Sequence, residues 1–210
     1  MNISLFANFY QPSELTTEEM EILAEKHQYW EVPKGTIILK QGEISNENYI
    51  IEKGVMRTYT FDSDNKEITT RLFFENELAI ETLSFFGRIP SPEFLETITD
   101  CKIWRFHWDT VQELYHTMPS FREWGRYWMT RELFLSETRM LDFKTLSAEQ
   151  RYQKLIHEKP KTIHEVPLKY IASFLGITDS TLSRIRKLKY FFALCQVINR
   201  KNLHSFVSLT

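Results

Sequence analysis

The spacing of apolar residues around Gly176 most constrains how this chain can fold. Apolar residues recur at helical intervals on both sides of that glycine: Ile171, Ala172 and Leu175 come before it, and Leu182, Ile185 and Leu188 come after it. Glycine itself interrupts a helical pattern and favours a turn. The segment therefore predicts a helix, a tight turn and a second helix.

Thr178 is well suited to cap the second predicted helix. Its hydroxyl can accept a hydrogen bond from the amide of Ser180 or Thr181, neither of which has an intrahelical partner. The helix should then begin at about Asp179. Its open side carries small hydrogen-bonding groups and cations: Asp179, Ser180, Ser183, Arg184, Arg186 and Lys187. Such a surface suits the major groove of DNA, although a helical hairpin whose charges only meet water fits the bare pattern equally well.

Charge is distributed unevenly along the chain, and this favours the DNA interpretation. Residues 147–210 contain 11 Lys and Arg against 4 Asp and Glu, a net charge of +7, which leaves 15 basic and 24 acidic residues before them. Phosphate binding through one end requires such an acidic body and basic end, because each neutralised phosphate releases condensed counterions.

The stretch VPLKYIASFLGITDSTLSRIRK resembles the DNA-reading segment of the Crp/Fnr transcription regulators, and most closely their short-chain branch common in Bacteroidetes. The resemblance implies double-stranded DNA as a partner. Thr178, Ser180 and Thr181 would hold phosphates, Ser183 and Arg184 would read base edges, and Arg186, Lys187 and Lys189 would contact the backbone. Asp179 stands in the same turn, where its carboxylate also favours the positive end of the helix dipole.

Short strands separated by turns characterise the first half of the chain. WEVPKGTIILKQGE contains two turns around a β-branched run, Tyr49 to Glu52 forms another strand, and the runs 55–61 and 67–74 flank a loop of Asp, Ser and Asn. This spacing predicts an antiparallel barrel or jelly roll. KGTIILKQGE and YIIEKGVMRTY are similar to the early strands of the Crp/Fnr sensor barrel.

The resemblance implies an effector pocket between about Phe73 and Phe106. In relatives that bind cyclic nucleotides, a Gly-Glu-Leu turn opens a short helix and an Arg pairs with the phosphate. Here the turn has Glu77 and Leu78 but no Gly, Ser91 stands near the expected Arg, and Arg88 lies ahead of that point. A buried phosphate would lack its bidentate counter-ion, so we do not expect cyclic AMP to bind in the usual way. The pocket residues would be Glu77, Leu78, Arg88 and Ser91, and the effector an unidentified small molecule.

One long helix is predicted from Ser120 to about Leu146, after a shorter helix that has Asp109 as its N-cap and that Pro119 ends. Its apolar stripe has steps of three, four and seven: Phe121, Trp124, Trp128, Leu135, Thr138 and Leu141 or Asp142. A helix of roughly 40 Å is too long for a barrel of this size to cover. The resemblance implies that it pairs with the same helix of a second copy, and packing on its own barrel alone is the alternative.

The remaining segments complete an α+β organisation. SAEQ at 147–150 fits a capping box, residues 157–165 form a loop, and Pro167 begins the first helix of the pair. Alternation around 199–202 would suit a wing. We therefore expect a jelly-roll sensor domain with flanking helices at 1–118, a dimerisation helix at 119–146 and a winged helix-turn-helix domain at 147–210.

Other classes of function fit less well. An iron oxygenase on a jelly roll needs two His and a carboxylate, but the six histidines are scattered and none lies between Tyr49 and Phe74. Cys101 and Cys195 are too few for a disulfide framework or a four-thiolate cluster. We expect a cytoplasmic, homodimeric regulator that is not an enzyme, with no cofactor, no metal and no membrane segment. The alternative is a ligand-binding module whose basic end docks on a protein.

Overall fold

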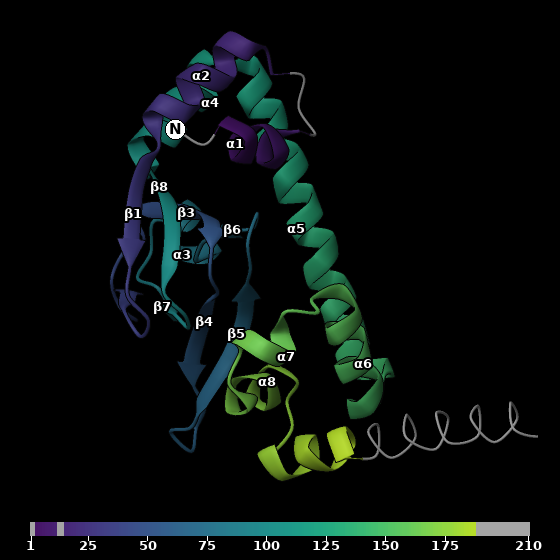
Figure 1. The fold of residues 1–210 in the computed structure, drawn as a ribbon. Coiled ribbons are helices and arrows are strands. Elements are labelled where there is room, and N and C mark those ends of the chain that lie inside the picture. Colours follow the sequence, from purple (N-terminus) through teal and green to yellow (C-terminus); the bar gives the residue numbers. More distant parts are fainter. Residues whose placement is uncertain (1–2, 12–14, 188–210) are drawn as a thin grey trace, which may run out of the picture.

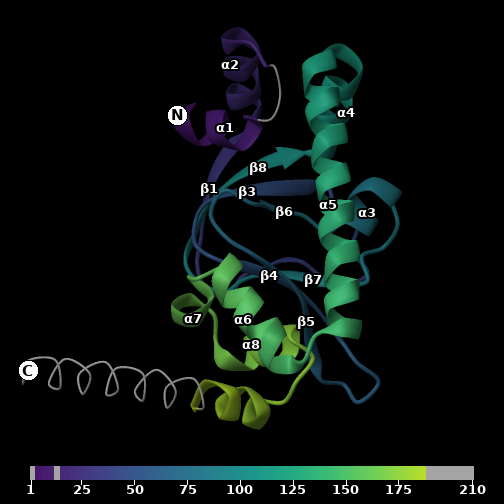
Figure 2. The same cartoon turned by 90° about the vertical axis from the view of Figure 1, so that its right-hand side faces the viewer.

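The computed structural model describes residues 3–11 and 15–187 of the chain. The predicted wing and Lys189 lie outside the described residues. The described part consists of a β-barrel with helices at one end, a long helix along its side and a second group of helices at the other end (Figures 1 and 2).

Eight antiparallel strands form the barrel, and they divide into two four-stranded sheets with orders β1-β8-β3-β6 and β2-β7-β4-β5. The strands are β1 (Gln28–Val32), β2 (Ile37–Leu39), β3 (Glu47–Lys53), β4 (Met56–Phe61), β5 (Glu67–Phe73), β6 (Leu78–Ala79), β7 (Phe94–Thr97) and β8 (Cys101–His107). Consecutive strands change sheets repeatedly, as in a jelly roll. The predicted fold class of the sensor domain is confirmed.

The predicted hairpin between β4 and β5 is present. Phe61 pairs with Glu67, and the side chain of Asp62 accepts hydrogen bonds from the amides of Asp64 and Lys66, both at 2.9 Å. The pairing shifts register between Thr58 and Tyr59. Since β5 is the last strand of its sheet, one side of its backbone has no neighbouring strand.

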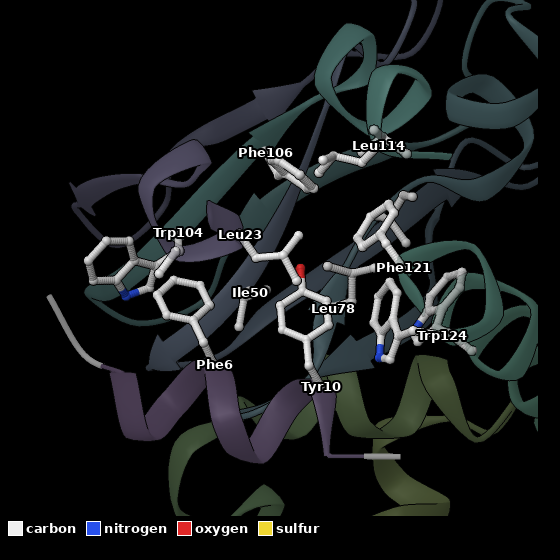
Figure 3. Packing of buried hydrophobic residues seen from close by; sticks show 14 of the residues in the cluster. Phe6, Tyr10, Leu23, Ile50, Leu78, Trp104, Phe106, Leu114, Phe121 and Trp124 are labelled. Carbon is white, nitrogen blue, oxygen red and sulfur yellow. The ribbon is translucent and has the colours of Figure 1, made fainter. Parts of the chain in front are cut away.

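Two N-terminal helices, α1 (Ile3–Tyr10) and α2 (Thr17–Lys26), close one end of the barrel. Helix α2 begins with a capping box between Thr16 and Glu19. Helix α1 contributes Phe6 and Tyr10 to an aromatic core that also contains Trp104, Phe106, Phe121 and Trp124 (Figure 3). Aromatic side chains from distant parts of the chain thus share one core.

Helix α4 (Trp108–Thr117) leads into α5 (Pro119–Thr145), the 27-residue helix that the sequence predicted. The prediction that Asp109 caps α4 is wrong by two residues. The cap is His107, whose Nδ1 accepts a hydrogen bond from the Asp109 amide at 3.2 Å. Pro119 occupies the first turn of α5, where its missing N–H costs no hydrogen bond.

The C-terminal group consists of α6 (Ala148–Glu158), α7 (Thr162–Glu165), α8 (Leu168–Phe174) and a helical segment at residues 179–187. The predicted capping box of Ser147 and Gln150 is present. The segment expected to be a loop contains α7, a single turn that closes when the Val166 amide donates to the Thr162 carbonyl. The capping box at Ser147 was therefore predicted correctly, whereas the one-turn helix α7 was not.

Candidate nucleic-acid interface

The helix, turn and helix predicted around Gly176 are present. Helix α8 buries Ile171 and Ala172, and the segment 179–187 buries Leu182 and Ile185 against the same cluster. The turn between them depends on Gly176, which has φ +67°, a left-handed conformation that side-chain-bearing residues rarely adopt. An added Cβ would also come within 3.1 Å of the Phe143 ring. The glycine thus fixes the angle between the two helices.

Thr178 caps the second helix as predicted. Its Oγ1 accepts a hydrogen bond from the Thr181 amide at 3.2 Å, and the Leu182 amide donates to the Thr178 carbonyl at 3.0 Å. The hydroxyl oxygens of Ser180 and Thr181 lie 2.9 and 3.0 Å from Thr178 Oγ1. Three hydroxyls therefore gather at a helix N-terminus, where the helix dipole favours negative charge.

Most of the predicted reading residues are exposed. Ser183, Arg184 and Lys187 are exposed, as are Thr178, Asp179 and Ser180, while Thr181 and Arg186 are partly buried. Within the described residues, no hydrogen bond or ion pair engages the side chain of Arg184, Arg186 or Lys187. The surface that the sequence assigned to DNA is therefore open and carries cations without counter-ions.

The lysines that precede this surface have different environments. Lys154 pairs with Asp142 at 2.5 Å, Lys159 pairs with Glu77 at 2.9 Å, and Lys161 pairs with Glu75. Their charges are matched by carboxylates of α5 and the barrel. Among the described cations of the C-terminal end, these three lysines are therefore neutralised by carboxylates, whereas Arg184, Arg186 and Lys187 of the second helix are not.

The four residues assigned to an effector pocket have separate surroundings. The Glu77 carboxylate accepts from the Phe74 amide at 3.0 Å and from Lys159, and Leu78 belongs to the aromatic core. Arg88 donates to the Ser45 carbonyl at 2.8 Å and to the side chain of Asn46. Ser91 donates to the nearby Glu93 carbonyl at 2.7 Å. Among the described residues, these four side chains share no hydrogen-bond partner.

The short helix expected to follow the Glu77 turn is α3 (Thr82–Gly87), which begins five residues after that glutamate. Its N-cap is the buried Glu81, whose carboxylate accepts hydrogen bonds from the amides of Leu83 at 3.1 Å and Ser84 at 2.7 Å. The first amides of this helix are thus already satisfied by a carboxylate of the chain. Glu81 was not predicted as this cap, because glutamate is not among the common N-cap residues.

Charged side chains that the sequence analysis did not single out connect the barrel to α5. Arg71 of β5 pairs with Glu132 of α5 and donates to the Thr82 hydroxyl at 3.2 Å. Arg139 of α5 donates to the Thr70 carbonyl, and burial lowers the pKa of its guanidinium. Burial likewise raises the pKa of the nearby Glu93 carboxyl. No local sequence signal marks these contacts, because β5 (EITTRLF) mixes polar and apolar residues.

The second half of α5 presents an apolar face to solvent. Leu133, Phe134 and Leu141 are 60, 66 and 56% exposed, and Tyr127, Met129 and Met140 are also exposed. Phe121, Trp124 and Trp128 instead pack on the barrel. The stripe expected from the sequence includes Phe121, Trp124 and Trp128, whereas Leu133 and Phe134 lie outside it, on a side of α5 that the barrel does not cover.

Two further observations concern metals and membranes. The described residues include no group of three or more His, Cys, Asp or Glu placed to hold a metal ion. In the described part of the chain, no helix has both the length and the apolar character needed to cross a bilayer.

Comparison with known proteins supports this architecture. Residues 29–118, which run from β1 to the end of α4, match the family profile of the cyclic nucleotide-binding domain. The anaerobic regulatory protein of Haemophilus influenzae is 22% identical over 194 residues, which cover 85% of this chain and 75% of that protein. The protein of the same name from Pasteurella multocida is 22% identical over 165 residues, 73% of this chain and 60% of that protein.

Solved structures extend the match beyond the barrel. FixK2 from Bradyrhizobium japonicum superposes with a TM-score of 0.70 at 17% identity, and the alignment covers 80% of this chain and 86% of FixK2. A crp/fnr-family structure from Eubacterium rectale gives a TM-score of 0.65 at 18% identity and covers 86% of this chain and 85% of that one. At such identities these structures establish the fold.

Proposed function

Because this chain is a relative of the Crp/Fnr transcription regulators, we propose that it is a homodimeric, sequence-specific DNA-binding regulator that acts in the cytoplasm. The observation that carries the proposal is the exposed N-terminal half of the second helix of the pair. There a hydroxyl cluster and unpaired cations lie on one open surface. A helix of this kind enters the major groove with its N-terminal residues toward the bases.

Each residue has a role in this proposal. Thr178, Ser180 and Thr181 bind a phosphate at the helix N-terminus. Ser183 and Arg184 contact base edges, and Arg184 can make a bidentate contact with guanine. Arg186, Lys187 and Lys189 contact the DNA backbone. Asp179 stabilises the first turn of the helix through the helix dipole.

The dimer in this proposal forms through the exposed face of α5. Tyr127, Phe134 and Leu141 recur every seven residues, as do Leu133 and Met140. A repeat of seven favours pairing of two helices along a shared seam. Two copies would then present two reading helices to two half-sites of the DNA.

The barrel in this proposal does not bind cyclic AMP in the usual way. No arginine stands at the predicted position near Ser91, and the Glu81 carboxylate already accepts from the first amides of α3. A second negative charge placed beside that buried carboxylate would be repelled. A small-molecule effector of this barrel would therefore have to be recognised through other groups.

Selection from a random duplex pool tests the proposed function. The wild-type chain should enrich one sequence, and its affinity for that operator should fall steeply between low and moderate salt.

Arg184→Ala should weaken operator binding by roughly 1 to 3 kcal/mol and relax the preference at one base position. Lys40→Ala removes an exposed cation of the barrel and should leave both the operator affinity and the base preference unchanged. A pool without enrichment, or a footprint that Arg184→Ala leaves intact, would contradict the proposal.

A further inference from the structure

Arg57 in β4 is a charged side chain with only 1% of its surface exposed. Its Nε and Nη2 donate to Glu96 at 2.9 and 2.7 Å, and Nη2 also donates to Glu67 at 2.7 Å. Its Nη1 donates to the Thr69 hydroxyl at 3.2 Å. The guanidinium is thus held in its plane by three residues of the neighbouring strands.

The same guanidinium also contacts two aromatic rings. The ring centre of Tyr59 in the barrel lies 4.1 Å from the guanidinium carbon, and the ring centre of Tyr170 lies 3.5 Å from it. Tyr170 belongs to α8, the first helix of the helix-turn-helix. A cation over the face of a ring is attracted to it, and more strongly when water is excluded. Arg57 therefore connects the sensor barrel to the DNA-binding end.

The backbone of β5 continues this connection. Ser173 of α8 accepts a hydrogen bond from the Thr69 amide at 2.7 Å and donates to the Glu67 carbonyl at 3.1 Å. Further along the strand, Lys159 donates to the Leu72 carbonyl at 2.9 Å. Side chains of the C-terminal end thus satisfy edge groups of β5 that have no neighbouring strand.

Fixing α8 also fixes the helix that would read DNA. Leu182 and Ile185 of the second helix belong to the same buried cluster as Ile171 and Ala172 of α8. The two helices therefore pack as one unit. In this docked arrangement Ser183 and Arg184 remain exposed, so the contact with the barrel leaves the reading surface free.

We propose that Arg57 is a positioning residue for DNA recognition, which acts through its stack on Tyr170 to hold the helix-turn-helix in the orientation that binds an operator. This inference rests on the proposed function. A dimer reads two half-sites at a fixed spacing, so both reading helices must keep a defined orientation. A helix-turn-helix released from the barrel has to be ordered during binding, which lowers affinity.

Substitution of Tyr170 separates this role from a structural one. Tyr170→Leu removes the ring over Arg57, whereas Tyr170→Phe keeps it and serves as the matched control. Tyr170→Leu should weaken operator binding about tenfold, or about 1.4 kcal/mol, and leave binding to a scrambled duplex unchanged. Hydrogen exchange should accelerate at the β5 amides, including that of Thr69. Tyr170→Phe should match the wild type within about twofold in each measurement.

Ser173→Ala provides an independent variant should Tyr170→Leu fail to fold, as judged by circular dichroism. It removes the contact with the β5 edge. Like Tyr170→Leu, it should weaken operator binding and accelerate hydrogen exchange at the β5 amides. Operator affinity at or above that of the wild type, unchanged β5 exchange, or an equal loss on the scrambled duplex would overturn the positioning role. A wild-type chain that enriches no operator would instead contradict the proposed function.

Discussion

His27 is a titratable side chain inside the aromatic core. It is 5% exposed, and its ring stacks on Phe106 with the ring centres 4.1 Å apart. Its Nδ1 donates to the Leu23 carbonyl at 2.6 Å, which leaves Nε2 to accept from the Tyr10 hydroxyl at 3.3 Å. These contacts require the neutral imidazole. Burial lowers the pKa of His27 to about 4, although the hydrogen bond to Leu23 opposes the shift.

This histidine should make stability depend on pH. The unfolded side chain binds a proton below about pH 6.5, and the folded one only below about pH 4. The neutral His27 therefore makes its full contribution to the free energy of unfolding above about pH 6.5. As the pH falls to 4, this free energy should decrease by about 3 kcal/mol. Urea unfolding at several pH values measures it. His27→Phe keeps the ring but not the titration, and its profile should be flatter than that of the wild type; parallel profiles would contradict the assignment.

At the scale of elements, α5 shows how one helix serves two environments. Its first half packs Trp124 and Trp128 on the barrel, and its second half exposes Leu133 and Phe134. Exposed apolar side chains in such a continuous group are typical of an interface. Helix α5 would thus pack on the barrel of its own copy and, through its exposed apolar side chains, on the second copy of the dimer.

Charge placed on the exposed face of α5 should dissociate the dimer. Phe134→Lys introduces an ammonium group that cannot be buried without a partner, so dimer affinity should fall at least about tenfold. Analytical ultracentrifugation over a concentration series measures the change. Gln41→Lys adds the same charge in an exposed turn of the barrel between β2 and β3, outside α5, and should leave the dimer intact. A wild-type chain that sediments as a monomer at all concentrations would exclude pairing through this face.

Elements with local signals could be predicted from the sequence. The capping box at Ser147, the turn at Gly176 and the alternating strands depend on residues within a few positions of one another. The resemblance covered the overall fold as well. The stack of Arg57 on Tyr170 could not be predicted, because it joins residues far apart in the chain whose meeting depends on how α8 docks on β5.

At the scale of the whole molecule, one hydrophobic cluster crosses the predicted domain boundary at residue 147. It combines Val55, Leu72, Phe74 and Ile98 of the barrel region with Leu155, Val166, Ile171 and other residues of the C-terminal helices. The C-terminal helices therefore do not have a separate core. The barrel and the DNA-binding end should unfold in one transition.

Tryptophan fluorescence can test this coupling, because all five tryptophans precede residue 147. Leu155→Ala removes a buried side chain of α6 and should destabilise the protein by about 2 to 5 kcal/mol. With a shared core, the tryptophans of the barrel and α5 should report that loss as a lower unfolding midpoint. Leu168→Ala, at a more exposed position of the same end, should shift the midpoint little. A midpoint unchanged by Leu155→Ala would show that the two parts unfold independently.

The contacts of Ser173 and Lys159 with β5 also bear on how the protein avoids aggregation. An open strand edge is a template on which strands of other molecules can add, and repetition of that step builds fibrils. In this chain the helices that would recognise DNA also shield that template. A lesion that displaced them would therefore both impair gene control and expose the barrel to polymerisation.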